Sequence, residues 1–256
     1  MSKKYLGEEI DIHAGGEDLV FPHHENEIAQ SEACNGKPFA RYWMHNAFLN
    51  IDNKKMSKSL GNFFTVRDIT EKYDPMVLRF FMLSAHYRSQ LNFSADLMEA
   101  AKNSLERIKN SESRMIELIK NAKDGSMTAE EEKNLSDAKE FMKKYEAAME
   151  DDFNTADAIS AMFELVKFMN TSAASENSKE YLEALNKELL TMADILGIKL
   201  TVEEEILDSE IEQLIEKRQN ARKNKDFALA DEIRNTLLEK GILLEDTREG
   251  VKWKRV

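Results

Sequence analysis

The sequence predicts a mainly α-helical protein with α/β parts, and three observations lead to this fold class. Only 3 prolines and 9 glycines occur in 256 residues. Glu, Lys, Leu, Ala and Met, which favour helices, are abundant. Apolar residues recur at helical spacing through the middle of the chain, whereas strand-like alternation is confined to regions near its two ends. We therefore expect an α/β region, an antiparallel helical bundle and a small C-terminal α+β unit.

The composition limits the classes of partner and compartment. A net charge of -12 excludes a protein whose whole surface coats nucleic acid or an acidic membrane. No stretch approaches the roughly 18 to 20 consecutive apolar residues that span a bilayer, and the N-terminus has no apolar signal-peptide core. The single cysteine, Cys34, excludes an internal disulfide and fits a reducing compartment. We expect a soluble cytoplasmic protein with no membrane contact.

The first region, residues 1–62, has the pattern of an α/β fold. Residues 9–13 alternate like a strand that Gly15-Gly16 ends, a helix follows Pro22 from about His23 to Cys34, and residues 42–51 form a second strand. Because a covered parallel sheet needs more strands and helices than these, we expect a further segment in front of Met1.

Two helical regions follow. In residues 63–94, Thr65 and Asp68 form a capping box, and Asp74-Pro75 starts a helix from Met76 to about His86 that is apolar nearly all round and so is expected to be buried. Residues 95–200 carry the pattern of four helices joined by short loops, as in an antiparallel bundle. Their expected starts are Ser94, Thr128, Asn154 or Thr155, and Ser178.

The C-terminal region, residues 207–256, reads as two helices, 209–224 and 227–240, and a hairpin of 242–247 with 251–256. Basic residues gather here in an otherwise acidic chain, and an indole lies among those of the last strand. Such a surface suits unpaired RNA bases, although Trp253 in an alternating strand is equally explained as core. The basic residues are Lys217, Arg218, Arg222, Lys223, Lys225, Lys252, Lys254 and Arg255.

The segment Lys54–Asn62 places three lysines, two serines and a glycine directly after a strand. Lysine supplies charge, and serine hydroxyls and free backbone N–H groups supply directed hydrogen bonds, so this loop predicts a phosphate site at the end of a sheet. A solvated basic turn explains the same composition.

Two further patterns precede this loop. On a helix, His23 and Glu27 would lie on one face, where an imidazole and a carboxylate can serve as two ligands of Zn²⁺. The alternative is a helix start at which His23 is hydrogen-bonded to Glu27.

The pair Gly15-Gly16 lets the backbone approach a ligand closely, and Asp18 can accept hydrogen bonds from that ligand. The alternative is a turn without a binding role.

Taken together, the motifs resemble those of the cysteinyl-tRNA synthetases, which are class I aminoacyl-tRNA synthetases. Residues 11–27, from Asp-Ile-His through Pro-His-His-Glu-Asn-Glu, are similar to the zinc-bearing stretch of that family. Residues 55–59 are the Lys-Met-Ser-Lys-Ser signature of class I enzymes. Further similar segments are 60–66, 86–89, 151–155 and Trp253.

The resemblance implies ATP-dependent activation of L-cysteine, with Mg²⁺, and its transfer to tRNA-Cys by a monomer. It implies a partial Rossmann-like nucleotide-binding domain (1–62) with the lysine loop, connecting helices (63–94), a tRNA-binding helical bundle (95–200) and an anticodon-binding domain (207–256). The implied residues are Lys55 and Lys58 for catalysis; Lys58, Asp18, Ser57 and Ser59 for ATP; His13 and Asp18 for the substrate pocket; His23 and Glu27 for zinc; and Trp253, Arg218, Arg222, Lys252 and Arg255 for tRNA.

The sequence also departs from the family. The family's HIGH motif and two further zinc-binding cysteines are not found, and neither Cys34 nor His45 replaces them. We therefore expect that this chain alone does not form the adenylate and holds zinc weakly at most. A mycothiol-pathway cysteine ligase, a non-catalytic tRNA-binding fragment and a plain helical scaffold remain open; the basic C-terminal region favours the synthetase over the mycothiol ligase.

Overall fold

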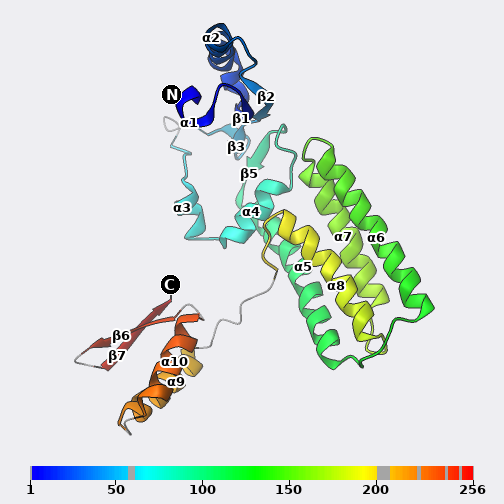
Figure 1. Cartoon of the computed structure of the whole chain (residues 1–256), viewed down its shortest axis with the longest axis vertical. Coiled ribbons are helices and arrows are strands. Elements are labelled where there is room, and N and C mark those ends of the chain that lie inside the picture. Colours follow the sequence, from blue (N-terminus) through cyan, green and yellow to red (C-terminus); the bar gives the residue numbers. More distant parts are fainter. Residues whose placement is uncertain are drawn as a thin grey trace. The chain divides into compact units, whose positions relative to one another are not determined.

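The computed structural model describes residues 2–56, 61–200, 208–223, 226–239, 242–247 and 250–255. The chain divides into two compact units, Met1–Thr201 and Val202–Val256, which are described separately. Both are mostly helical, with small two- and three-stranded sheets (Figure 1). In the described part of the chain, no helix is long and apolar enough to cross a membrane.

A parallel pair of strands forms the start of the first unit. After helix α1 (Ser2–Leu6), strand β1 (Ile10–Gly16) pairs with β2 (Ala40–Asn46), and helix α2 (Glu25–Asn35) lies in the crossover. The prediction that the first strand ends at Gly15-Gly16 is confirmed: these two residues form the last pairs of the ladder, with His45 and Asn46, and a 3-10 turn begins at Glu17.

The predicted helix start near His23 agrees with the backbone to within two residues. A 3-10 turn (Glu17–Leu19) and a π-helical turn (Val20–His24) come first, and α2 begins at Glu25. The interruption lies at Phe21, which has extended dihedrals (φ -129°, ψ 132°), so the helical backbone runs from Pro22 into α2.

The predicted strand 42–51 is divided between two sheets. Its second part is β3 (Leu49–Ile51), which pairs parallel with β5 (Leu91–Phe93) and antiparallel with β4 (Lys54–Lys55). Asp52 and Asn53 make the tight turn between β3 and β4 with φ of 48° and 60°, a left-handed conformation that these two residue types tolerate. The lysine loop thus leaves a strand that is bonded directly to β5.

Two short helices connect this sheet to the bundle. Helix α3 (Val66–Thr70) begins at the predicted capping box of Thr65 and Asp68, and α4 (Pro75–Leu83) begins after Asp74; both predictions are confirmed. The expectation that α4 is buried on all sides is wrong: Val77, Phe80 and Phe81 are buried, but Met82 is 47% exposed.

The predicted four helices of the next region are confirmed. They are α5 (Ala95–Asn121), α6 (Ala129–Glu150), α7 (Thr155–Ser172) and α8 (Lys179–Ile195), which pack against one another. Each begins at a capping side chain: Ser94, Thr128, Asn154 and Ser178. A continuous core joins these helices to α4, with methionine prominent in it, as at Met98, Met115, Met162, Met169 and Met192.

The second unit has its own small core. Helices α9 (Asp208–Lys223) and α10 (Phe227–Glu239) pack together, and strands β6 (Ile242–Thr247) and β7 (Gly250–Arg255) form the predicted antiparallel hairpin. The buried residues of this unit's hydrophobic cluster are Ile211, Ile215, Ile233, Leu237, Ile242 and Leu244.

Candidate active site

A cluster of two imidazoles and a carboxylate lies between β1 and the start of α2. Nε2 of His13, on β1, lies 2.8 Å from Oε2 of Glu27, on the first turn of α2. One ligand atom from each of His13, His24 and Glu27 lies within 4.8 Å of the others. Two nitrogens and one oxygen at this spacing match the three protein ligands of a catalytic zinc site.

His24 is the most enclosed member of this cluster. It is buried, and its Nδ1 lies 2.8 Å from Nε2 of His45, so one ring donates a hydrogen bond to the other. Burial, followed by the proximity of His13, lowers the pKa of His24 and so favours the neutral imidazole. The neutral form is the one that binds metals.

Gly15 makes room for this ring. A Cβ atom at position 15 would lie 2.7 Å from Cε1 of His24 and 3.1 Å from its Nε2. Any side chain here would therefore displace the imidazole, which gives Gly15 a steric role in addition to its position at the end of β1.

An aromatic wall supports the imidazoles. The rings of His13 and Trp43 stack with centroids 4.6 Å apart and an interplanar angle of 17°, and His45, two residues further along β2, lies on the same side of the strand. Phe39, which is buried, meets His13 edge-on. These contacts fix the orientation of His13 toward Glu27.

Of the four predicted site residues in this region, two lie in the cluster and two lie outside it. His13 and Glu27 lie together, whereas the side chain of His23 is exposed and outside the cluster, where His24 occupies the position expected for it. His23 lies in the π-helical turn before α2, and the ligand atoms that gather at Glu27 come from His13 and His24 instead. Asp18 is exposed in the 3-10 turn directly after β1, with Oδ1 folded over Gly16.

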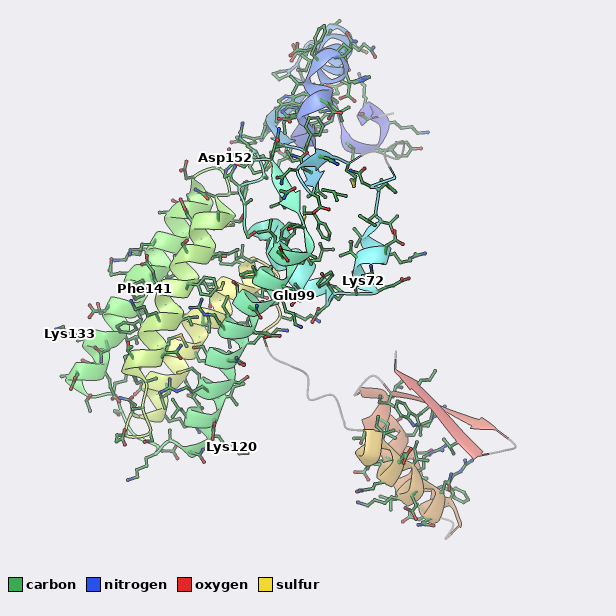
Figure 2. All side chains as sticks on the ribbon, turned by 180° about the vertical axis from the view of Figure 1, so that it is seen from behind. Lys72, Glu99, Lys120, Lys133, Phe141 and Asp152 are labelled. Atoms are coloured by element: carbon green, nitrogen blue, oxygen red, sulfur yellow. The ribbon has the colours of Figure 1, made fainter. Side chains whose placement is uncertain are left out.

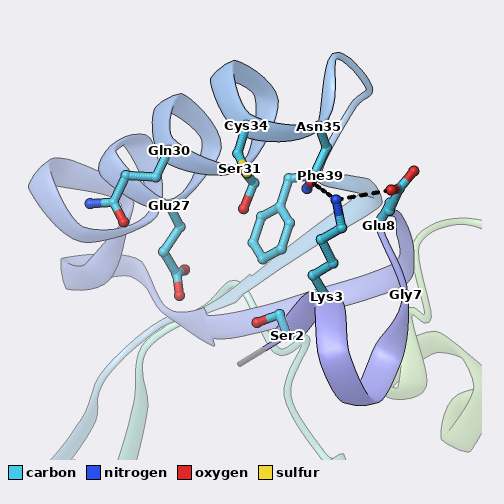
Figure 3. Close-up of a pocket in the computed structure, with 10 residues that line it drawn as sticks. All are labelled: Ser2, Lys3, Gly7, Glu8, Glu27, Gln30, Ser31, Cys34, Asn35 and Phe39. Carbon is cyan, nitrogen blue, oxygen red and sulfur yellow. Dashed lines mark hydrogen bonds and ion pairs between the residues drawn. The ribbon is translucent and has the colours of Figure 1, made fainter.

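A polar pocket of about 250 Å³ adjoins the cluster, and Glu27 lines it (Figure 3). Lys3 reaches across its mouth, with Nζ 3.0 Å from both Oε1 of Glu8 and Oδ1 of Asn35. The exposed thiol of Cys34 also lines this pocket, at the C-terminal end of α2. Glu27 therefore faces both the imidazoles and a space that a small polar molecule can enter.

The lysine loop is described only at its edges. Lys55 lies in β4 opposite Asn50, but its side chain and the predicted residues Ser57, Lys58 and Ser59 lie outside the described part. Beside the loop is an apolar cavity of about 180 Å³ between β3, α3 and α4. Its lining includes Ile51, Met56, Phe64, Ile69, Met82 and Phe93.

The predicted tRNA-binding residues of the second unit occupy different environments. Arg218 is buried, at 4% exposure, and Trp253 is half-buried against the core of the unit, as the alternative interpretation of this residue expected. Arg222 is exposed. Lys252 and Arg255 lie in β7 opposite Glu245 and Ile242, and their side chains are outside the described part.

Sequence reasoning missed His24, His45 and Trp43. The available signal was the pairing of the first two strands: in parallel register His13 is opposite Trp43 and Gly15 is opposite His45. That register depends on long-range pairing, which neither strand specifies alone.

Comparison with known proteins adds to this geometry. Three family models match in order along the chain: the tRNA synthetases class I (C) catalytic domain over residues 1–103, the DALR domain over 144–201, and the Cysteinyl-tRNA ligase anticodon binding domain over 205–253. The fold and these matches define the chain as a class I aminoacyl-tRNA synthetase sequence.

Curated relatives identify the family within this class of synthetases. The chain is 66% identical over 255 residues to Cysteine--tRNA ligase of Lachnospira eligens, 62% identical over 260 to that of Lachnoclostridium phytofermentans, and 56% identical over 256 to that of Bacillus cytotoxicus. It belongs to the cysteinyl-tRNA synthetase family. These matches cover 100% of this chain but only 54–55% of each relative, so the chain spans about half their length.

Solved structures show the same fold at low identity. An Agrobacterium radiobacter LeuRS in a ternary complex with tRNA and LeuAMS matches 72% of this chain with a TM-score of 0.59 and 15% identity, covering 25% of that protein. Mycobacterium tuberculosis methionyl-tRNA synthetase bound by methionyl-adenylate matches 73% with a TM-score of 0.57 and 16% identity, covering 41% of that protein.

Proposed function

We propose that this chain works in the ATP-dependent activation of cysteine and its transfer to tRNA-Cys, as a cysteine–tRNA ligase. The observation that carries the proposal is the 66% identity to a Cysteine--tRNA ligase across the full chain. The His13–His24–Glu27 cluster supports it, because open α/β sheets bind ligands beyond the carboxyl ends of their strands, and the cluster joins β1 to the segment that follows it. Residues 1–62 are then part of a Rossmann-like domain that carries one portion of the active site.

In this proposal the lysine loop supplies electrostatic stabilisation. Lys55 and Lys58 neutralise the charge that develops on pyrophosphate as the adenylate forms, a form of help that is large in phosphoryl and nucleotidyl transfer. Ser57, Ser59 and Asp18 contribute hydrogen bonds to ATP, which binds with Mg²⁺. Because β4 is bonded to β3, the loop starts from a fixed position in the sheet.

The cluster is proposed to hold zinc. Two ligand sets share Glu27: His23 with Glu27 from the family resemblance, and His13, His24 and Glu27 from the geometry of the described side chains. Zinc supplies a soft site for the cysteine thiolate, for which a serine hydroxyl is a far poorer ligand. His45 and Trp43 fix the two imidazoles, and His13 and Asp18 line the substrate pocket.

The remaining regions are proposed to bind tRNA. Residues 63–94 connect the catalytic region to the bundle of 95–200, and 207–256 reads the anticodon. In this unit Arg222, Lys252 and Arg255 are the proposed RNA contacts, and Arg218 and Trp253 shape the surface from within. The enzyme is proposed to act as a cytoplasmic monomer.

A chimaera tests the proposal. The matched half of the Lachnospira eligens relative is replaced by this chain, and cysteine-dependent exchange between pyrophosphate and ATP is measured. The chimaera should retain exchange, and Lys58→Ala should reduce it by about 100-fold or more, the loss typical of a transition-state charge contact. A folded chimaera that binds tRNA but never forms adenylate would instead favour the non-catalytic tRNA-binding fragment.

A further inference from the structure

A groove on the helical bundle, far along the sequence from the cluster, gathers positive charge. It has a volume of about 440 Å³ and is lined by residues of α5 and α7 only. Arg107 and Arg114 enter it from α5, and Lys167 from α7. Hydroxyl and amide groups complete its polar lining: Asn110, Ser111, Asn170 and Thr171. We refer to it as the α5–α7 pocket.

The cations of the α5–α7 pocket have no acidic partners. Among the described residues, none of Arg107, Arg114 and Lys167 forms an ion pair with a carboxylate, although Asp and Glu outnumber Lys and Arg by 48 to 36 in the chain. Arg107 instead lies over the ring of Phe163, at 5.3 Å from its centroid. In an acidic chain, three neighbouring cations left without a carboxylate leave a local positive potential at this groove.

Arg114 is the third cation of the groove, and one of its donors is unpaired. Its Nη2 donates a hydrogen bond to the carbonyl oxygen of Ala173, at 2.6 Å, which fixes the plane of the guanidinium. Its Nη1 is buried and has no hydrogen-bond partner among the described residues, although buried polar groups are nearly always paired. Because Nη1 is closed to solvent in this structure, an acceptor in the groove pairs with it only after the guanidinium turns toward the groove.

Asn170 adds a further donor to the groove. The hydroxyl of Ser111 donates to Oδ1 of Asn170, at 3.1 Å, so the amide oxygen of Asn170 is already used, while its NH₂ group has no partner of its own among the described residues. Phe163 holds Arg107 at the rim by the cation–π contact.

We propose that the α5–α7 pocket binds a phosphate group. A guanidinium fork, a second guanidinium and an ammonium on two facing helices match a multiply charged anion with several acceptor oxygens better than a single carboxylate, which one arginine saturates. The phosphate has two possible sources, an RNA backbone or a free phosphorylated compound. The proposal does not depend on the catalytic function proposed above.

The test begins with inorganic phosphate and the full chain. The side-chain Nε–Hε resonances of Arg107 and Arg114 should shift in a saturable way on titration, and acetate at equal ionic strength should not produce this shift. The double variant Arg107→Gln/Lys167→Gln should weaken phosphate binding at least tenfold. Both positions are exposed, so its melting temperature should stay unchanged; Arg114→Lys, which keeps the charge but loses the fork, gives a second variant.

A tRNA arm distinguishes the two sources. The matched control is Lys133→Gln/Lys139→Gln, which removes two exposed cations from α6 outside the pocket; Lys133 is labelled in Figure 2. If the source is RNA, the pocket variant binds tRNA more weakly than the control, and the slope of log affinity against log salt falls by about 2. If the source is a free compound, the two variants bind tRNA alike while only the pocket variant loses phosphate.

Two results would overturn the proposal. One is the lack of a saturable phosphate response at Arg107 and Arg114 in the folded chain. The other is an equal response to acetate, which would reduce the groove to a general anion contact. Neither result bears on adenylate formation by the chimaera, so the two proposals fail independently.

Discussion

Glu131, on the first turn of α6, binds the residue that caps α8. Its Oε1 accepts a hydrogen bond from the backbone N–H of Ser178 at 2.8 Å, and its Oε2 accepts one from the Ser178 hydroxyl at 3.0 Å. The same carboxylate completes the capping box with Thr128 and accepts a bond from Asn177. One buried side chain therefore closes the starts of two helices, by bonding to a residue 47 positions further along the chain.

The first prediction concerns acid stability. Burial alone would raise the pKa of Glu131, but hydrogen bonds from Thr128, Ser178 and Asn177 outweigh it and lower the pKa to about 2. A lowered folded-state pKa stabilises the fold above the unfolded value near 4.5, and this contribution is lost as the pH falls toward 2. Glu131→Gln should cost about 2 to 3 kcal/mol at pH 7 and flatten the pH dependence between these values.

Urea unfolding of the first unit at several pH values measures this effect. Glu132→Gln is the matched control, because Glu132 is exposed on the same turn and should change stability by less than about 0.5 kcal/mol. An equal loss in both variants would rule out the special role of Glu131.

The second prediction concerns the junction between the connecting segment and the bundle. Asp152, at the α6–α7 corner labelled in Figure 2, accepts hydrogen bonds from Nε of Arg88 at 2.6 Å and from the hydroxyl of Tyr87 at 2.7 Å. Nε2 of His86 lies 3.1 Å from its carbonyl oxygen. Asp152→Ala should accelerate amide hydrogen exchange in residues 84–93 without unfolding the bundle, whose core is elsewhere.

Asp152→Asn should give a smaller acceleration, because asparagine keeps an acceptor and tolerates the φ of 56° at this position. Arg88, and then Tyr87, lower the pKa of Asp152, so the wild-type contact should persist as the pH falls below the ordinary range of aspartate. Unchanged exchange in the alanine variant would show that Asp152 does not hold the junction.

The third prediction concerns zinc. Because Glu27 belongs to both proposed ligand sets, Glu27→Gln should weaken zinc binding at least tenfold, measured by competition with a chromogenic chelator. His23→Ala and His24→Ala then assign the imidazole: the described geometry predicts the larger loss for His24, and the family resemblance predicts it for His23. Zinc affinity that is unaffected by Glu27→Gln would remove the cluster as the metal site.

The fourth prediction concerns the lysine loop. Lys55→Ala and Lys58→Ala should change the stability of this chain by less than about 0.5 kcal/mol, since lysine side chains in proteins are mostly exposed and changes of exposed residues usually have small effects. In the chimaera the same changes should reduce cysteine activation by about 100-fold or more. A large fall in melting temperature would instead indicate a structural role for these lysines.

The fifth prediction separates folding from tRNA binding in the second unit. Trp253 packs on the core of this unit, so Trp253→Ala should lower its unfolding free energy by about 1 to 3 kcal/mol as well as weaken tRNA binding. Arg222→Gln, at an exposed position, should weaken tRNA binding and its salt dependence while leaving stability unchanged. Loss of tRNA binding only in Trp253→Ala would assign the whole effect to folding.

Local features were predictable from the sequence. The capping boxes at Thr65 and Thr128, the start of α4 at Asp74-Pro75 and the C-terminal hairpin are all as predicted. Each depends on interactions between residues close in the chain, where residue type alone selects the conformation. In the candidate site, Glu27 was predicted as a zinc ligand together with His23, and His13 was implied as a pocket residue by the family resemblance, but the contact between His13 and Glu27 was not predicted.

The sequence by itself therefore determined where most of the helices begin and the family to which the motifs belong. The tertiary structure decided which side chains meet: it joined β3 to β5 across 42 positions (Leu49 to Leu91), brought His24 rather than His23 to Glu27, and buried Arg218. The physical reason is that strand register and burial depend on contacts between segments that are distant in the chain. Alternative contacts compete for the same segments, so no single segment specifies the result.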